Sequence, residues 1–478
     1  MLQALINIFR VPELRSKVLF TLAMLAVYRI GFWIPVPGVD QNSLQEFFKT
    51  NVTGDATGVG RMFQFVQVFS GGSFSHSTIF GLGIMPYISA GIIFQLIATA
   101  YEPLKKIQQE GPSGRQKIME WTRYLTLALC VIQGVGWLTY ISQSGLVYPN
   151  WAANPLWWVM ALTSMTAGCI FLMWLGEQID KYGIGNGVSL IIAAGILAHM
   201  PQAAFWVIQN SPIRELGFVA STFGFERAEA SITWMGVLAL IAAFFMVIAG
   251  CVLITVAQRR IPVQQAKHTR GRKVFGGQRS YLPLRINHGG VMPIIFASSL
   301  MMIPSVAFGY LKSSTQGTTG WVHGISTFLG DSFAIGEYPY ELSYIIMIFF
   351  FSYFWTTVQF NPEEMSKQLR DHGSFIPGLR PGPRTAEYLE TVMERITFVG
   401  AAFLSVIAVV PTVVNKSLNI DWSVTQFLGG TGLLIVVSVG LDLIQRVEAN
   451  LLMRNYAGFL GGADDGKGPR IRGPRGGL

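Results

Sequence analysis

Long stretches of apolar residues, separated by short polar segments, run along the whole chain. Val18–Pro37, Ile79–Ala100 and Val237–Val256 are typical of them. A helix needs about 20 residues to cross the roughly 30 Å of hydrocarbon in a bilayer. The pattern therefore predicts an all-α polytopic membrane protein with ten transmembrane helices. The expected spans cover residues 18–38, 77–101, 121–143, 154–175, 187–209, 232–257, 289–311, 341–360, 395–415 and 423–445.

The charged residues agree with this assignment and orient the chain. Of the 478 residues, 51% are hydrophobic and only 13% are charged, whereas a soluble domain carries roughly 25% charged residues. If both ends lie on one side, 28 of the 35 Lys and Arg residues fall on that side, counting Arg123 and Arg395 at the first turns of their spans; six fall on the other side, and Arg29 lies within the first span. The side rich in Lys and Arg should be the cytoplasm. Both termini are therefore expected to be cytoplasmic.

No motif in the chain indicates catalysis or a cofactor. Cys130, Cys169 and Cys251 fall inside predicted spans and are expected to be small core residues rather than disulfide partners or metal ligands. The patterns GxxxxGK[ST], HExxH and GxSxG do not occur. The segment GIGNG at Gly183–Gly187 does not complete the GxGxxG motif of a dinucleotide site, because the motif's last glycine is missing. We expect no enzyme activity, no metal and no cofactor. The first residues, 1–17, lack a small-residue cleavage site and should be a retained amphipathic segment.

One short phrase occurs twice. GIMPYISA stands at Gly83–Ala90 in the second span, and GVMPIIFA stands at Gly290–Ala297 in the seventh. The copies are five spans apart, and because five is odd, the repeated units enter the membrane from opposite sides. This predicts two inverted five-helix halves around a pseudo-two-fold axis. The expected organisation is 1–17 N-terminal segment, 18–209 first half, 210–231 external hinge loop, 232–445 second half with cytosolic loops 258–288 and 361–394, and 446–478 basic tail.

Each copy of the phrase contains a proline within a predicted span. Proline removes a backbone hydrogen bond, so Pro86 and Pro293 predict kinked helices that face protein or a cavity. Ile84 and Ile88 are four residues apart and should share one helical face at the kink. Ile295 is placed similarly in the second copy.

Inverted repeats of this kind suit two classes of membrane protein. A secondary transporter of small solutes would place coupling charges near mid-membrane. Arg29 is the clearest charged residue inside a span, and we expect it to snorkel outward or to pair within the bundle. A passive conduit lined by apolar side chains fits the sequence better than a transporter does.

Several long segments resemble the SecY family, the channel-forming subunits of the bacterial Sec protein translocase. The resemblance runs in order from the first span to the tenth. It is carried by GRMFQFVQVFSGGSFSHSTIFGLGIMPYISAGIIFQL (Gly60–Leu96), GEQIDKYGIGNGVSLII (Gly176–Ile192), YLPLRINHGGVMPIIFASS (Tyr281–Ser299), FIPGLRPGPRTAEYL (Phe375–Leu389) and GGTGLLIVVSVGLD (Gly429–Asp442).

The resemblance implies a clamshell of two five-helix halves in the inner (plasma) membrane, around a central pore closed by an apolar ring and a plug. A narrow apolar ring resists wetting and limits ion leakage. The ring positions correspond to Ile84, Ile88, Ile192, Ile295 and Ile435. The plug corresponds to about residues 61–76, including Met62, Phe63, Phe65, Val66 and Phe69, with Gly71 and Gly72 as its hinge.

The second and seventh helices are then expected to face each other as a lateral gate through which signal sequences reach lipid. Their prolines should weaken the backbone, and small side chains should let the helices approach and separate. The gate residues are Pro86, Ser89, Ala90, Pro293, Ala297, Ser298 and Ser299.

The sixth loop, residues 258–288, holds eight basic residues and no acidic one. A positive-inside signal explains part of this excess, and such a patch can also grip RNA phosphates or acidic protein surfaces. The resemblance assigns Arg259, Arg260 and Arg380 to docking of the ribosome, including ribosomal RNA, and of the SecA motor ATPase. It also implies SecE-like and SecG-like membrane subunits, signal sequences and nascent polypeptides as partners, within the lipid bilayer.

Overall fold

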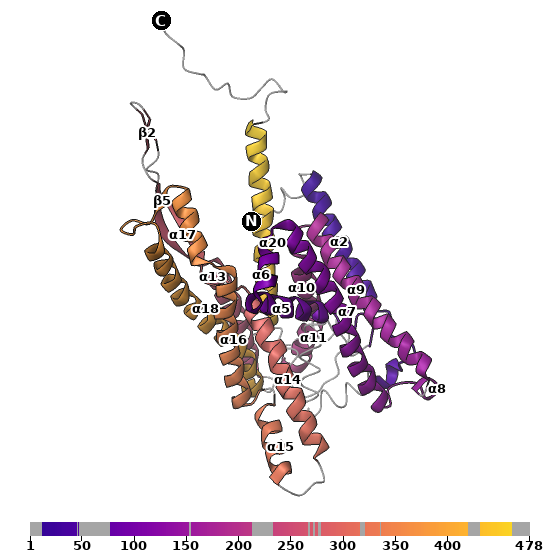
Figure 1. Ribbon diagram of the computed structural model, residues 1–478. Helices are drawn as coiled ribbons and strands as arrows, with labels where there is room; N and C mark the ends of the chain where they lie inside the picture. Colours follow the sequence, from indigo (N-terminus) through magenta and orange to yellow (C-terminus); the bar gives the residue numbers. More distant parts are fainter. Residues whose placement is uncertain are drawn as a thin grey trace.

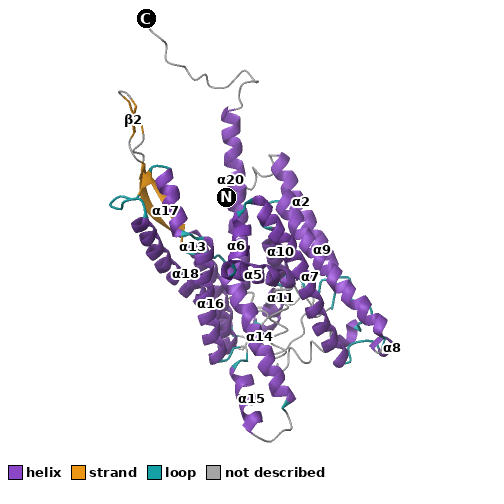
Figure 2. Cartoon of the chain, in the orientation of Figure 1, coloured by secondary structure: helices purple, strands orange, loops and turns teal. Residues whose placement is uncertain are grey.

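The computed structural model describes residues 12–44, 46, 77–152, 154–212, 233–265, 268–270, 273–275, 279–315, 321–334, 336–418 and 431–460. Within them the chain is mostly helical (Figures 1 and 2). A helix lies on each of the ten predicted spans. Six helices are long and apolar enough to cross a membrane, and α5 and α14 contain shorter apolar stretches, Met85–Ala98 and Met292–Met301.

The first half contains eight of the described helices. They are α2 (Pro12–Gly31), α5 (Met85–Ala100), α6 (Glu102–Gln109), α7 (Pro112–Gln143), α8 (Pro149–Ala152), α9 (Pro155–Tyr182), α10 (Gly187–Ala198) and α11 (Met200–Asn210). Helix α9 packs against α2, α7 and α10, and α5 packs against α7. The fifth predicted span is thus formed by α10 and α11 together.

The second half contains seven described helices. They are α13 (Trp234–Val256), α14 (Met292–Ser314), α15 (Trp321–Ser332), α16 (Tyr338–Gln359), α17 (Pro362–Asp371), α18 (Pro383–Leu418) and α20 (Thr431–Leu460). Helix α16 packs between α14 and α18, and α20 packs against α13. Helix α20 also packs against α10, so it is the element that most extensively joins the two halves (Figure 1).

The two copies of the repeated phrase are helix starts, and the predicted proline kinks are wrong. Helix α5 begins at Met85 and α14 at Met292, so Pro86 and Pro293 are each the second residue of a helix. Proline is tolerated there because its missing N–H would have no intrahelical partner in any case. Gly83 and Gly290 precede the helices with φ of 58° and 60°, a left-handed conformation that favours glycine. The phrase recurs because it builds the same glycine turn and proline-led helix in each half.

The segments after α13 and α17 are not wholly helical, which the all-α expectation did not include. Strand β1 (Gln258–Gln265) pairs in antiparallel fashion with β4 (Arg279–Arg285) and β5 (Ser374–Phe375), and β2 (His268–Arg270) pairs with β3 (Lys273–Phe275). Ile261 and Val263 alternate with exposed residues along β1 and pack with Leu389 of α18. Strands β4, β1 and β5 therefore form a small sheet fixed to one end of the second half, and β2 and β3 form a separate two-stranded sheet (Figure 2).

Candidate functional site

Five isoleucines from four elements are buried in the interior of the bundle. Ile84 is the N-cap of α5, Ile88 lies one turn further along, and Ile192, Ile295 and Ile435 come from α10, α14 and α20. All five are between 1% and 9% exposed and belong to one apolar cluster that both halves contribute to. The structure thus buries all five predicted ring residues in the same large apolar cluster, and their arrangement as a ring stays a prediction.

The helix starts fix two of these positions in equivalent places. The backbone N–H of Ile88 donates to the carbonyl of Ile84 at 3.2 Å, and the N–H of Ile295 donates to the carbonyl of Val291 at 3.2 Å. Ile88 and Ile295 each lie five residues after the left-handed glycine of their phrase. The first turn of α5 and the first turn of α14 therefore present matching isoleucines to the centre of the molecule.

The predicted gate residues lie on α5 and α14. Ala90 and Ala297 are completely buried, and Ser89 is half-buried. The hydroxyls of Ser298 and Ser299 donate to the carbonyl of Ile295 in their own helix, at 2.9 and 2.7 Å. Both hydroxyls are therefore bonded within α14 itself. Helices α5 and α14 also lack the extensive contact that α10 makes with α20.

The predicted plug cannot be placed, because residues 61–76 lie outside the described residues. This applies to Met62, Phe63, Phe65, Val66, Phe69, Gly71 and Gly72. Most of the expected hinge loop and the end of the tail, residues 213–232 and 461–478, lie outside them as well.

The predicted docking arginines are exposed at the sheet end of the second half. Arg259 and Arg260 lie on β1 opposite Leu284 and Pro283 of β4. Arg380 is exposed in the turn between β5 and α18, where its carbonyl accepts a hydrogen bond of 2.9 Å from the hydroxyl of Thr385. None of the three forms an ion pair with another residue that the structure describes. Their charges therefore face solvent on anchored backbone.

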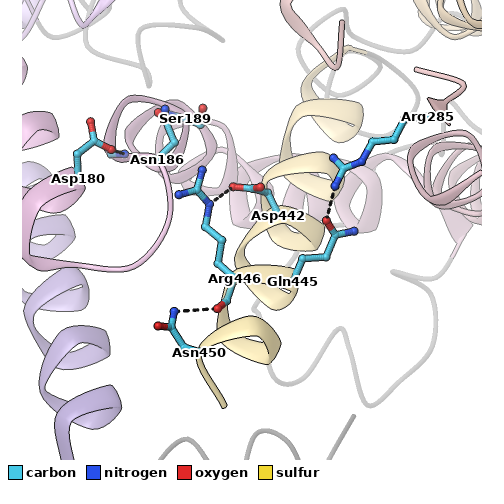
Figure 3. Close-up of polar contacts among 9 residues, drawn as sticks. Asp180, Asn186, Ser189, Arg285, Asp442, Gln445, Arg446 and Asn450 are labelled. Atoms are coloured by element: carbon cyan, nitrogen blue, oxygen red, sulfur yellow. Dashed lines mark hydrogen bonds and ion pairs between the residues drawn. The ribbon is translucent and has the colours of Figure 1, made fainter. Parts of the chain in front are cut away.

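A pocket that the sequence analysis did not predict, here called the polar funnel, lies between the halves. It has a volume of about 390 Å³ and is lined by Asn186 and Ser189 of the first half and by Arg285, His288, Asp442 and Arg446 of the second. Nε of Arg446 lies 2.8 Å from Oδ2 of Asp442, and Arg285 donates to Oε1 of Gln445 at 3.0 Å (Figure 3). Burial, together with the charge of Arg285, lowers the pKa of His288 and favours its neutral form.

The signal for this funnel was present in the sequence but incomplete. Asp442 lies near the end of the last span and Arg446 directly after it, so both read as residues of a membrane boundary. Nothing in the local pattern places them against Asn186, which is about 260 residues earlier in the chain. That contact arises only when α20 packs against α10.

Comparisons with known proteins agree with the fold and with the resemblance. The family profile described as SecY matches residues 78–444. The protein translocase subunit SecY of Thermotoga maritima is 40% identical over 99% of this chain and 100% of its own length. The protein of the same name from Chlamydia trachomatis is 39% identical over 95% of this chain and 97% of its own length.

Two solved structures share the architecture. One is described as the structure of a protein conducting channel, with a TM-score of 0.56, 18% identity and coverage of 94% of this chain and 95% of the other. The other is Sec61 in the canine ribosome-channel complex from the endoplasmic reticulum, with a TM-score of 0.53, 17% identity and the same coverage. At these identities the likeness concerns the fold, which is a bundle of ten helices in two halves.

Proposed function

Since this chain belongs to the SecY family, we infer that it is the channel subunit of a protein translocase. It is a multi-pass membrane protein that conducts unfolded secretory polypeptides and releases hydrophobic segments laterally into lipid. The observation that carries this function is the burial of five isoleucines from both halves in one apolar cluster. A transporter of small solutes is not favoured, since Arg29 is exposed on α2 and lies over the ring of Phe32.

The isoleucine ring is the closure of the proposed pore. Its members carry no polar atom in their side chains, so a narrow passage between them stays dry and blocks ions. A polypeptide can displace such side chains without specific bonds, which suits a channel that must accept many sequences. The polar funnel beneath the ring then receives the chain from the cytoplasm, and the proposed plug, residues 61–76, closes the ring from the outer side.

The seam between α5 and α14 is the proposed lateral gate. The small residues Ala90 and Ala297 allow close approach of the two helices, and the hydroxyls of Ser298 and Ser299 are already bonded within α14. Separation of these helices therefore breaks few polar bonds. An apolar segment of about 7–15 residues, as found in signal sequences, can then pass from the pore into lipid.

The halves proposed for this movement are residues 18–209 and 232–445, joined by the hinge loop 210–231. Both termini are proposed to lie in the cytoplasm, where the 28 Lys and Arg residues of the richly charged side would also lie. The site is proposed to act as a conduit, so that energy comes from a partner. The proposed motors are a SecA-like ATPase and the translating ribosome.

The exposed arginines are the proposed docking surface for those partners. Arg259, Arg260 and Arg380 present cationic groups from the sheet and from the adjacent turn. Such groups bind RNA phosphates and acidic protein surfaces. A relative of the same fold is described in a ribosome-channel complex, which supports a ribosomal partner here. SecE-like and SecG-like membrane subunits are the remaining proposed partners.

Reconstitution tests the proposed function. The chain, co-purified with its small membrane partners in mild detergent, should move a secretory precursor into proteoliposomes when a SecA-type motor and ATP are supplied. Omission of the motor is the control. Transport of a small solute by the chain alone, without precursor movement, would favour the transporter instead.

A further inference from the structure

The turn between α9 and α10, Gly183–Gly187, is shaped by three glycines that the channel function does not by itself explain. A Cβ on Gly183 would lie 2.6 Å from the hydroxyl oxygen of Thr21, and a Cβ on Gly187 would overlap the carbonyl oxygen of Gly176. Gly185 has a φ of 102°, which L-residues rarely adopt. The GIGNG segment is therefore a close-packed turn and not a nucleotide loop.

Hydrogen bonds attach this turn to three elements of the first half. The N–H of Ile184 donates to the hydroxyl of Thr21 on α2 at 3.1 Å, and that hydroxyl donates in turn to the carbonyl of Lys17. The N–H of Gly187 donates to Asp180 at the end of α9 at 2.8 Å. The side chain of Asn186 caps α10 by accepting from the N–H of Ser189 at 3.0 Å. The turn is thus held rigidly within the first half.

The other side of the turn packs against α20 of the second half. Ile184 and Val447 belong to one small apolar cluster that also includes Leu14, with Leu443 packed against it. A Cβ on Gly185 would lie 3.4 Å from a methyl carbon of Leu443, which is ordinary contact. Further along, α10 packs extensively against α20. The two halves are therefore tightly joined at this place.

Charges add to this contact at its rim. The guanidinium of Arg446 bonds to Asp442 on its own helix and points toward the turn that carries Asn186 (Figure 3). Its charge also acts on Asp180, the residue that bonds the Gly187 N–H. Arg446 is thus paired with Asp442 of its own helix and acts electrostatically on Asp180 of the first half.

We propose that the Gly183–Gly187 turn and the face of α20 that carries Leu443, Arg446 and Val447 form the fixed cytosolic pivot of the two halves. The pivot stays in contact while α5 and α14 separate, and Arg446 is a positioning residue for α20. This proposal rests on the proposed gate function. It assigns the movement to one side of the molecule and the fixed contact to the other.

The pivot acts on the pore through the length of α20. Ile435 lies eleven residues before Arg446 on the same helix, which corresponds to about 16 Å along the axis. A helix held at one end tilts as a lever, so a small rotation at the pivot displaces Ile435 within the ring. Loosening of the pivot should therefore weaken closure of the pore without removing any residue of the ring.

A disulfide across the pivot tests the fixed contact. The three native cysteines are replaced, one cysteine is placed at Ile184, and a second is placed at Leu443 or Val447. Oxidation should cross-link at least one pair, and translocation of a precursor in proteoliposomes should stay within about twofold of the reduced sample. A cross-link that blocks translocation until reductant is added would overturn the proposal, as would failure of both pairs to oxidise. If the cysteine-free parent also fails to translocate, the proposed channel function is at fault instead.

Substitution of Arg446 tests the electrostatic part. Arg446→Gln should raise acceptance of a precursor with a weakened signal sequence by roughly two- to fivefold, the range expected for loss of one partly exposed ion pair. Arg446→Lys keeps the charge and should restore most of the stringency. Arg123→Gln is the matched control, because Arg123 pairs with Glu177 at 2.7 Å wholly within the first half. Equal stringency in Arg446→Gln and Arg123→Gln would overturn the role of Arg446.

Discussion

The two places where the halves meet are built in opposite ways. At one side, the α9–α10 turn and α10 contact α20 through apolar packing, close-packed glycines and an ion pair. At the proposed gate, α5 and α14 lack extensive contact, and the hydroxyls of Ser298 and Ser299 bond within α14. An interface with many packing contacts resists separation, whereas an interface with few hydrogen bonds between its helices can open. The comparison assigns stability to one interface and movement to the other.

Locking the seam should have the largest effect. In a cysteine-free chain, one cysteine replaces Ser89 and a second is scanned from Ile294 to Ile303. Some pair should oxidise readily and abolish translocation, because α5 and α14 can no longer part, and reduction should restore it. If every efficiently cross-linked pair translocates normally, the gate does not lie between α5 and α14, and the proposed difference between this seam and the pivot is wrong.

Polar substitution in the ring should have the next largest effect. Ile88→Asn and Ile435→Asn each place a hydrogen-bonding amide where the closed pore must stay dry. Planar-bilayer recordings of the resting channel should then detect ion conductance well above that of the parent chain. A parent-like conductance in both variants would mean that the seal lies elsewhere and that movement of α20 does not control it.

Charge reversal on the sheet should weaken docking while leaving both interfaces intact. Arg259→Glu with Arg260→Glu, or Arg380→Glu, should reduce binding of a ribosome or of a SecA-type motor by about tenfold or more at low salt, because attraction becomes repulsion. Sedimentation binding at two salt concentrations measures this effect. Binding that is unchanged and insensitive to salt would show that these charges serve topology alone.

A methyl group in the pivot turn should cost stability. Gly187→Ala forces a Cβ against the carbonyl of Gly176 and should reduce the free energy of unfolding by about 1–3 kcal/mol. Gly136→Ala on α7 is the control, since a Cβ there meets no atom within 4 Å. Thermal unfolding in detergent compares the two. Equal melting temperatures would argue against a close-packed turn.

Removal of the gate hydroxyls should have the smallest effect. Ser298→Ala and Ser299→Ala delete bonds that lie inside α14. Each substitution should therefore change the free energy of unfolding by less than about 0.5 kcal/mol, and the translocation rate should stay close to that of the parent chain. Measurement of translocation rates with a normal and a weakened signal sequence checks this. A large change would place a polar bond across the seam and reduce its difference from the pivot.

Much of the fold was accessible from the sequence because it depends on local hydrophobicity. Runs of about 20 apolar residues locate membrane helices, and the repeated phrase relates the halves. The same phrase was misread in detail, since a proline inside an apolar run can kink a helix or begin one. The glycine that opens each phrase was the better signal, because Gly83 and Gly290 adopt the left-handed conformation that ends a turn.

The sheet and the funnel were not predicted, for different physical reasons. The alternation of buried apolar and exposed residues in β1 is short, and the basic residues around it were interpreted only as a signal of the cytosolic side. Asp442 and Arg446 line the funnel only because α20 packs beside the end of α9 and the start of α10, and no local sequence pattern predicts that packing. Ile84, Ile88, Ile192, Ile295 and Ile435 could be selected as a set only through the family resemblance. Burial in one cluster brings them together but leaves their role as a seal to experiment.

The glycine turn before α5 also has a consequence for the surrounding lipid. Because the helix begins only at Met85, it has 16 residues and a length of about 24 Å, less than the roughly 30 Å of a bilayer core. The irregular backbone before it is buried in protein, with Ser77, Thr78 and Leu82 each at most 5% exposed. Hydrophobic mismatch should therefore thin the bilayer beside the seam. A segment released at the proposed gate should then enter a shorter hydrocarbon path than elsewhere around the protein, so that membrane thickness would itself determine lateral release.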